Sequence, residues 1–580
     1  MTVRASLALL VSTAFLSACA TTQQAPLAPV AVVEAPAVET PVAAAASEHD
    51  QLFQLFKDSD EASLKLNPIS GIFRGDARFG DSLGDGITNA YFDAARALAQ
   101  ADLKRLRTID RSQLNATDQL AYDVFEYSNK DGLEGLSPAL LSLTAVRPLN
   151  HFFGFQTFYP TFANGKGAAP FKTVADYDNN LKRHTNYAWW IDQAITRFRE
   201  GAASNVVETK MTIRNVIEQL DNQLAQKPGE SQFYGPMKQF PAGFSDADKS
   251  RLTAAHRAAI VGEIYPALTR LRDYLKTDYL PKARDGAGIM YMKGGDRLYR
   301  YLVRSTTTLD MTPDEIHQLG LGEVARITGE MEKIKTEVGF KGSLAKFFDH
   351  LRTDPKFKMN SREALTQGYY DIGKAIDARM PEYFSTIPKT KLEIRPYDPT
   401  IEKFQAGGSY EQGTPDSARP GTFYFSAYDL PSRTTPGMTT LYLHEGSPGH
   451  HFQISLAQEN EALPAFMRFG GNTAYVEGWA LYSETLGYDM GLYKDPYQRF
   501  GTLSDEMLRA MRLVVDTGIH SKGWTRQRSI DYMLSNSDMG KTDATAEVER
   551  YIVIPSQALA YKIGALTIQR LRKKAETELG

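Results

Sequence analysis

The stretch RLTAAHRAAIVGEIYPALTRLRDYL at residues 251–275 shows the pattern that runs through most of the chain. Its apolar residues recur every three or four positions, which places them on one face of an α-helix. Residues 91–106 and 187–198 follow the same pattern. Breaks rich in proline and glycine, at 160–170 and 227–244, separate such segments as loops. The sequence therefore predicts a mainly α-helical protein.

One region departs from this pattern and lies directly before the most informative residues. Residues 391–430 hold short apolar runs around pairs of glycine, which is typical of two or three short strands. We therefore expect a small β-sheet before the candidate active-site helix. We also divide the body into an N-terminal helical part, 49–290, and a part that carries the candidate site, 291–580.

The first residues of the chain predict where in the cell the protein is located. Residues 1–18 place an apolar run, too short to span a bilayer, behind Arg4, which is typical of a signal peptide. The last residues before Cys19 resemble the bacterial lipobox, in which the cysteine is lipidated; the alternative is an ordinary secretory peptide. Residues 19–48, rich in Ala and Pro, read as an extended tether. Because Ala20 rather than Asp follows the cysteine, we expect an outer-membrane lipoprotein of the bacterial envelope, facing the periplasm.

Composition excludes several classes of protein. The 66 basic and 69 acidic residues leave a formal net charge of -3, which argues against a nucleic-acid binder. A hydrophobic content of 42% is enough for a large core. Cys19 is the only cysteine, which excludes a disulfide framework and any multi-cysteine metal site. Phosphate-loop and nucleophile-elbow signatures are absent from the sequence.

Three of the ten histidines, His444, His450 and His451, fall within eight residues. His444 and Glu445 follow an apolar lead-in and so match the opening of the zinc-peptidase motif HExxH. In that motif two histidines four apart bind zinc from one helix face, while the glutamate activates a water molecule. Here the fourth residue after His444 is Pro448, so the standard spacing is not met.

A straight helix would bring neither later histidine to His444. His450 would be rotated by about 240°, and His451 would lie about 10.5 Å along the axis. The intervening Gly446-Ser447-Pro448-Gly449 offers a solution, because proline removes a backbone donor and glycine permits unusual torsion angles. We expect a two-residue bulge in this segment, which would bring His450 beside His444.

A carboxylate on a following helix is the expected third ligand. Glu477 and Glu484 are seven residues apart and share one face amid apolar neighbours. A buried carboxylate is costly unless it is paired or bound to a metal ion. The alternative is that these glutamates pair with Arg509, Arg512 or other cations.

Residues 441–453, LYLHEGSPGHHFQ, and 475–484, YVEGWALYSE, are similar to the bacterial family catalogued as domain of unknown function eight hundred and eighty-five. The similarity extends over about residues 400–565 and includes segments 512–520 and 555–564. That family groups with the gluzincin-type metallopeptidases. The resemblance therefore implies a large helical metallopeptidase fold around a substrate cleft, with one zinc ion per chain.

Carried over onto this chain, the resemblance implies the zinc ligands His444, His450 and Glu477 and the catalytic base Glu445. His450 and His451 stay alternatives because the HExxH spacing is not met. His450 is favoured, since the glycine before it lines up with the Gly-His that ends the HExGH motif of related carboxypeptidases.

Together with this resemblance, these residues imply zinc-dependent hydrolysis of peptide bonds in short peptides. Zinc with three protein ligands keeps one position for water and lowers its pKa, and Glu445 would take the proton as that water attacks the scissile carbonyl. His520 and Tyr561, or Tyr551, would donate to the developing oxyanion.

Other parts of the chain offer candidate contacts to a peptide substrate. Residues 422–428 would bind an extended peptide by edge pairing. Arg419 or Arg550 would hold a substrate carboxylate, unless these arginines are solvated or structural.

Two other functions fit the same residues. One is a different metal-dependent amide or ester hydrolase that acts on cell-wall material. The other is a non-catalytic binding lipoprotein whose histidines are structural. The oligomeric state is left open.

Overall fold

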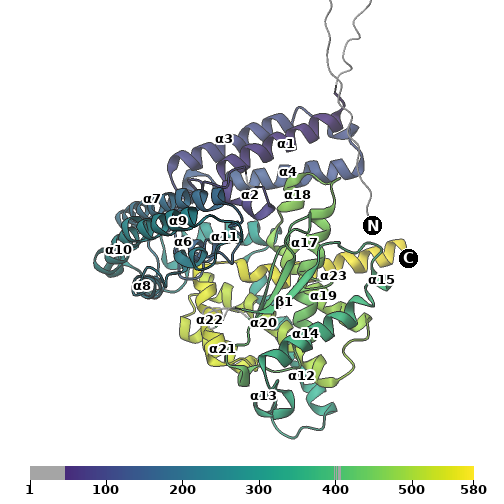
Figure 1. Cartoon of the computed structure of the whole chain (residues 1–580). Coiled ribbons are helices and arrows are strands. Elements are labelled where there is room, and N and C mark those ends of the chain that lie inside the picture. The colour runs from purple at the N-terminus through teal and green to yellow at the C-terminus, as the bar shows by residue number, and fades with distance from the viewer. Residues whose placement is uncertain (1–45, 77, 398, 400–401, 403–406) are drawn as a thin grey trace, which may run out of the picture. The chain divides into compact units, whose positions relative to one another are not determined.

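The computed structural model describes residues 46–580 apart from 77, 398, 400–401 and 403–406, and residues 47–580 form one compact unit. The signal peptide at 1–18, Cys19 and nearly all of the tether at 19–48 lie outside the described residues. The described chain is mainly helical with one small sheet, which confirms the predicted fold class (Figure 1).

The first helices form a layer of their own. Helix α1 (Glu48–Leu66) begins at Ser47, whose hydroxyl accepts from the Asp50 backbone while the Asp50 side chain accepts from the Ser47 backbone. This reciprocal cap satisfies two backbone donors that a helix start leaves free. Apolar residues on α1 pack against α3 (Asn89–Leu106) and α4 (Ala116–Gly135). Three shorter helices belong to the same half of the chain: α2 (Pro68–Arg74), α5 (Pro138–Thr144) and α6 (Phe155–Phe162).

A second group of helices surrounds the largest apolar core of the N-terminal half. Its members are α7 (Val174–Ser204), α8 (Lys210–Leu224), α9 (Asp246–Ala259) and α10 (Tyr265–Tyr274). The periodic stretch 251–275 supplies most of α9 and all of α10, joined by a π-helical turn at Ile260–Ile264. The predicted helix at 187–198 lies within α7.

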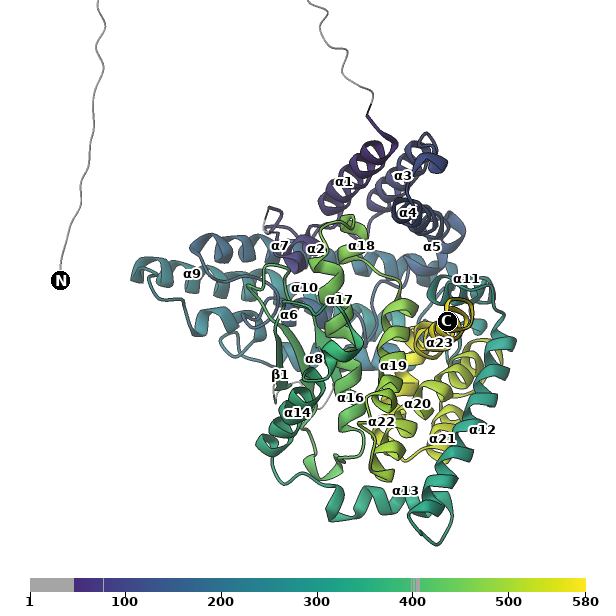
Figure 2. The same cartoon turned by 90° about the vertical axis from the view of Figure 1, so that its right-hand side faces the viewer.

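Long helices of the C-terminal half pack in pairs and frame the candidate site. Helix α12 (Pro313–Glu337) runs along α20 (Pro496–Ser521), and α19 (Thr473–Asp489) runs along α23 (Ala560–Leu579) (Figures 1 and 2). Helices α21 (Arg526–Asn536) and α22 (Lys541–Val553) pack against α20. The remaining helices here are α11 (Gly295–Thr307), α13 (Leu344–Thr353), α14 (Arg362–Asp377), α15 (Met380–Tyr383), α16 (Met438–Glu445), α17 (His450–Glu459) and α18 (Ala465–Phe469).

The small sheet lies where the sequence predicts it, directly before α16. Its strands are β1 (Leu392–Pro396), β2 (Gly408–Glu411) and β3 (Gly421–Phe425), in the order β1-β3-β2. Strand β3 pairs parallel with β1 and antiparallel with β2, so it is the central strand. The prediction that 422–428 offers a free edge to a peptide is therefore wrong, because the backbone of β3 is already paired on both sides.

One apolar core crosses the division at residue 290. It combines Leu143 and Val206 with Leu298, Leu513 and Leu559. Within the described residues no single helix is long and apolar enough to cross a membrane; helices 541–553 and 557–579 meet that test only together, across a bend of 116°.

Candidate metal centre

The chain leaves the helix between His444 and His450 rather than forming a bulge within one helix. Helix α16 ends at Glu445, and α17 begins at His450. Gly449 must be glycine in this turn, because a Cβ there would overlap the carbonyl oxygens of Leu443 and His444. The turn brings the two histidine rings to a centroid separation of 4.8 Å, as the predicted bulge was meant to do.

Helix α19 supplies the third side chain of the cluster. Glu477 Oε2 lies 3.3 Å from His450 Nε2 and 3.9 Å from His444 Nε2. One ligand atom from each of these three residues lies within 4.8 Å of the other two. Ligand atoms around a tetrahedral zinc ion lie about 3.3 Å apart, so small side-chain rotations would suffice to hold one ion. The arrangement thus fits a two-histidine, one-carboxylate site.

Glu484, seven residues further along α19, contacts the other ring nitrogen of His444 and is not part of the cluster. Its Oε1 lies 2.7 Å from His444 Nδ1. With Glu484 accepting the Nδ1 proton, the lone pair of Nε2 is directed toward Glu477. Burial raises the pKa of the Glu484 carboxyl well above its usual value, and Arg509, 3.6 Å away, opposes this. The alternative interpretation, in which these glutamates pair with an arginine, therefore applies in part to Glu484.

The two adjacent histidines point to different partners. His451 Nδ1 lies 3.1 Å from the Tyr410 hydroxyl and 3.4 Å from that of Ser455, so the ring faces β2 and its own helix. His450 faces Glu477, and its buried Nδ1 has no hydrogen-bond partner among the described residues. The geometry therefore places His450, and not His451, in the cluster.

Glu445 is buried at the end of α16. Burial raises the pKa of its carboxyl to about 7, with the charge of Glu477 adding to the shift and His450 and Arg509 opposing it. A carboxyl group that titrates near neutral pH can both accept and return a proton. The pKa of Glu477 moves the other way: burial would raise it, but hydrogen bonding and charge from His450, with Tyr561, outweigh burial and lower it.

The structure brings Tyr561 to this cluster but not His520. The Tyr561 ring stacks on His444 with centroids 6.4 Å apart, and its hydroxyl accepts from Arg550 Nη2 over 3.1 Å. His520 uses both ring nitrogens on the backbone: Nδ1 accepts from Ile289 N–H over 3.2 Å, and Nε2 lies 2.9 Å from the carbonyl of Tyr551. His520 therefore has no free ring nitrogen to offer a substrate.

Two further candidates lie in other environments. Arg419 donates to the carbonyl of Phe73 over 3.1 Å. The Tyr551 hydroxyl donates to Glu547 and accepts from Arg512 Nε. Sequence reasoning missed Glu547, although its spacing of three and four residues from Arg550 and Tyr551 on one helix marks it as their neighbour.

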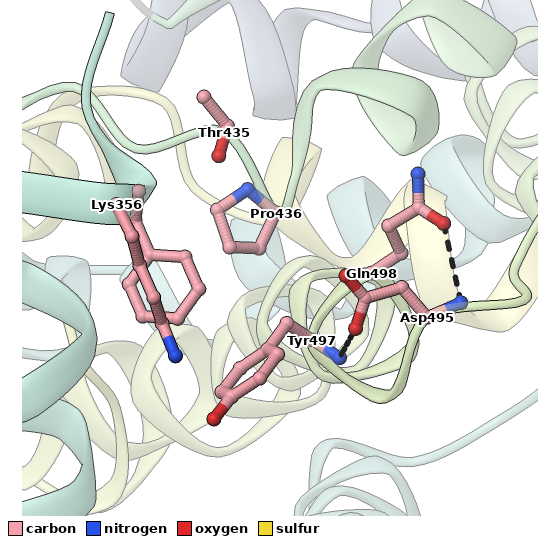
Figure 3. A pocket seen from close by; sticks show the side chains of 7 residues that line it. Lys356, Thr435, Pro436, Asp495, Tyr497 and Gln498 are labelled. Carbon is pink, nitrogen blue, oxygen red and sulfur yellow. Dashed lines mark hydrogen bonds between the residues drawn. The ribbon is translucent and has the colours of Figure 1, made fainter.

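A separate hollow lies at the N-terminal ends of α16 and α20 and contains no residue of the cluster. It has a volume of about 430 Å³. The side chain of Asp495 accepts from the backbone of Tyr497 and so caps α20, as Figure 3 shows. The residues that line this hollow are Lys356, Phe357, Thr435, Pro436, Asp495, Tyr497 and Gln498.

Comparison with known proteins places most of the body in one family. A family model described as bacterial protein of unknown function (DUF885) matches residues 68–580, which confirms the resemblance seen in the motifs. No curated protein matches the chain.

Two solved structures share its fold. A candidate lipoprotein from Colwellia psychrerythraea is 27% identical, with a TM-score of 0.86 over 92% of this chain and 94% of that one. A candidate lipoprotein of unknown function from Shewanella oneidensis is 17% identical, with a TM-score of 0.67 over 92% and 95%, and shows the fold alone. The first relative supports the lipoprotein character that the leader predicts.

Proposed function

Because the chain belongs to the bacterial family of unknown function DUF885, we propose its function from the site itself: zinc-dependent hydrolysis of peptide bonds in short peptides. The observation that carries the proposal is the convergence of His444, His450 and Glu477 within 4.8 Å, next to the buried Glu445.

The donor set suits zinc. Two imidazole nitrogens and one carboxylate oxygen are ligands that zinc accepts in catalytic sites, which keep a further position open. The carboxylate of Glu484 fixes the ring of His444 from behind, as outer partners of metal-binding histidines do. A zinc ion held there would polarise a substrate carbonyl and make a water molecule more acidic.

The remaining steps fall to side chains of this chain. Glu445 would accept a proton from the attacking water and pass it to the leaving amine. The Tyr561 hydroxyl would donate a hydrogen bond to the oxygen that gains negative charge, since the Tyr561 ring stacks on that of His444 at the cluster. The burial of Glu445 and the metal-binding cluster keeps bulk water away, which strengthens each of these electrostatic interactions.

The leader and the relative from Colwellia psychrerythraea support an envelope location for this activity. We propose that lipidated Cys19 anchors the protein to the outer membrane and that the body faces the periplasm. Its substrates would then be peptides present in that compartment.

The test is Glu445→Gln, which removes the base and keeps the size of the side chain. We expect the variant to retain one zinc per chain while kcat/KM on a mixed peptide library falls by about 10²- to 10⁴-fold. The matched control is Glu461→Gln, because Glu461 is exposed beyond α17 and should leave turnover unchanged. Full activity of Glu445→Gln would show that the assigned base is wrong.

A further inference from the structure

We propose that Arg550, supported by Arg512, binds the terminal carboxylate of the substrate, so that the enzyme removes single residues from the carboxyl end of peptides. This proposal rests on the proposed peptidase function and adds its substrate class.

The first argument is an uncompensated charge beside the cluster. The guanidinium groups of Arg512 and Arg550 lie over the ring of Tyr561, 4.4 and 6.0 Å from its centroid. Among the described residues Glu547 is the one carboxylate within ion-pair distance of either arginine. It lies 2.9 Å from Arg512 Nη2 but 3.7 Å from Arg550 Nη1, so it mainly neutralises Arg512. Arg512, Arg550 and Glu547 together therefore carry one positive charge, and Arg550 is the less closely paired of the two arginines.

The second argument is a pair of unused hydrogen-bond donors. Arg512 Nη1 and Arg550 Nε are buried and have no hydrogen-bond partner within the described part of the chain. Arg512 as a whole is only 4% exposed. A buried donor without a partner costs about 1–3 kcal/mol, and charged groups cost more. A substrate carboxylate would both neutralise the charge and accept these protons.

The third argument is position. Arg550 Nη2 donates to the Tyr561 hydroxyl over 3.1 Å, and the Tyr561 ring stacks on that of His444 in the cluster with centroids 6.4 Å apart. A carboxylate on Arg550 would thus have Tyr561 as a common neighbour with the cluster, because the Arg550 guanidinium lies 6.0 Å from the centroid of the Tyr561 ring. One extended residue spans about 3.3–3.6 Å. A substrate whose terminal carboxylate lies one residue beyond the bond that is cut would therefore reach from the cluster to Arg550 alongside Tyr561.

The fourth argument is access. The Arg550 guanidinium lies 5.4 Å from the ring of Phe152, which is 41% exposed. The next residue, Phe153, is 64% exposed. The Arg550 side chain is itself 13% exposed, so part of it faces solvent beside these surface rings.

The experiment compares two versions of one short peptide, a free acid and its carboxyl-terminal amide, digested by the full-length protein and followed by mass spectrometry. We expect loss of the last residue from the free acid, with kcat/KM at least 10-fold above that for the amide. Arg550→Gln should bring the ratio of the two rates close to one. Arg499→Gln, which removes a partly exposed arginine from an ion pair with Glu337, should keep the wild-type ratio. Unfolding midpoints and zinc content would show that Arg550→Gln is folded.

Two outcomes would overturn the proposal. If wild-type protein cuts the acid and the amide equally well, the peptidase function stands and the carboxylate site is wrong. If neither peptide is cut, calorimetric binding of both to Glu445→Gln decides: equal affinities refute the site, whereas at least 10-fold tighter binding of the free acid supports it. Failure of the site and failure of the peptidase function therefore give different results.

Discussion

Gly478→Ala should separate the two helices that hold the candidate site together. Helix α19 carries Glu477, and α23 carries Tyr561. The two helices cross at Gly478 and Gly564, where a Cβ added to Gly478 would lie 2.5 Å from the Cα of Gly564. Carbon atoms in contact normally stay about 3.5–4.0 Å apart. The helices would therefore have to move apart by about 1 Å, since backbone atoms cannot rotate out of the way.

Two opposing contributions decide whether Gly478→Ala raises or lowers the free energy of unfolding. Alanine is favoured over glycine in a helix interior by about 1 kcal/mol. Overpacking a tight contact costs about 1–3 kcal/mol, and a clash with backbone belongs at the upper end. We therefore expect Gly478→Ala to lower the free energy of unfolding by about 2 kcal/mol. A shift of about 1 Å also exceeds the roughly 0.5 Å within which a functional constellation must be held, so metal affinity should fall as well.

The assay is denaturant unfolding followed by far-ultraviolet circular dichroism. The matched control is Gly322→Ala on α12, where an added Cβ meets no atom within 4 Å. The free energy of unfolding of this control should rise by up to about 1 kcal/mol. If Gly478→Ala proves as stable as Gly322→Ala, the close helix crossing and the reasoning from it are wrong.

Three further predictions concern single side chains. Glu484→Gln replaces the carboxyl group that contacts His444 Nδ1 and should weaken zinc affinity about 10- to 100-fold in a chelator competition; unchanged affinity would contradict the supporting role. Burial lowers the pKa of His520 to about 3, so between pH 6.5 and 3 the unfolded chain takes up a proton that the folded protein does not. Stability should therefore fall as pH drops through this range, by up to about 1.4 kcal/mol per unit, and His520→Gln should flatten the slope of unfolding midpoint against pH. Gly449→Ala would overlap the carbonyl of His444 and should abolish zinc binding, as metal analysis would detect; a fully loaded variant would refute the need for glycine there.

Local patterns predicted the elements of the fold well. The helices at 91–106 and 187–198 form because their apolar residues repeat at helical spacing and find a core to face. The sheet at 391–430 formed as expected, yet the order of its strands did not follow from the pattern. Periodicity shows which residues form a strand, while pairing depends on partners elsewhere, so nothing local marked β3 as central.

The candidate site was predictable to the extent that it depends on short spacing. The glycines and the proline between His444 and His450 indicated that the helix could not continue straight, although not that it would end and restart. His520 is different, because its partners Ile289 and Tyr551 lie 231 and 31 residues away in sequence. Such contacts leave no local signal. The distinct positions of Glu477 and Glu484 were likewise hidden, since helical spacing puts both on one face and only the packing of α16 separates them.

Metal content tests the central claim most directly. The body, residues 47–580, would be analysed for zinc as the wild type, as His450→Ala and as His451→Ala, the adjacent histidine that faces Tyr410 instead. The account predicts about one zinc per chain in the wild type and in His451→Ala, and none in His450→Ala. Zinc retained by His450→Ala, or a wild type that binds none even when zinc is added, would contradict it.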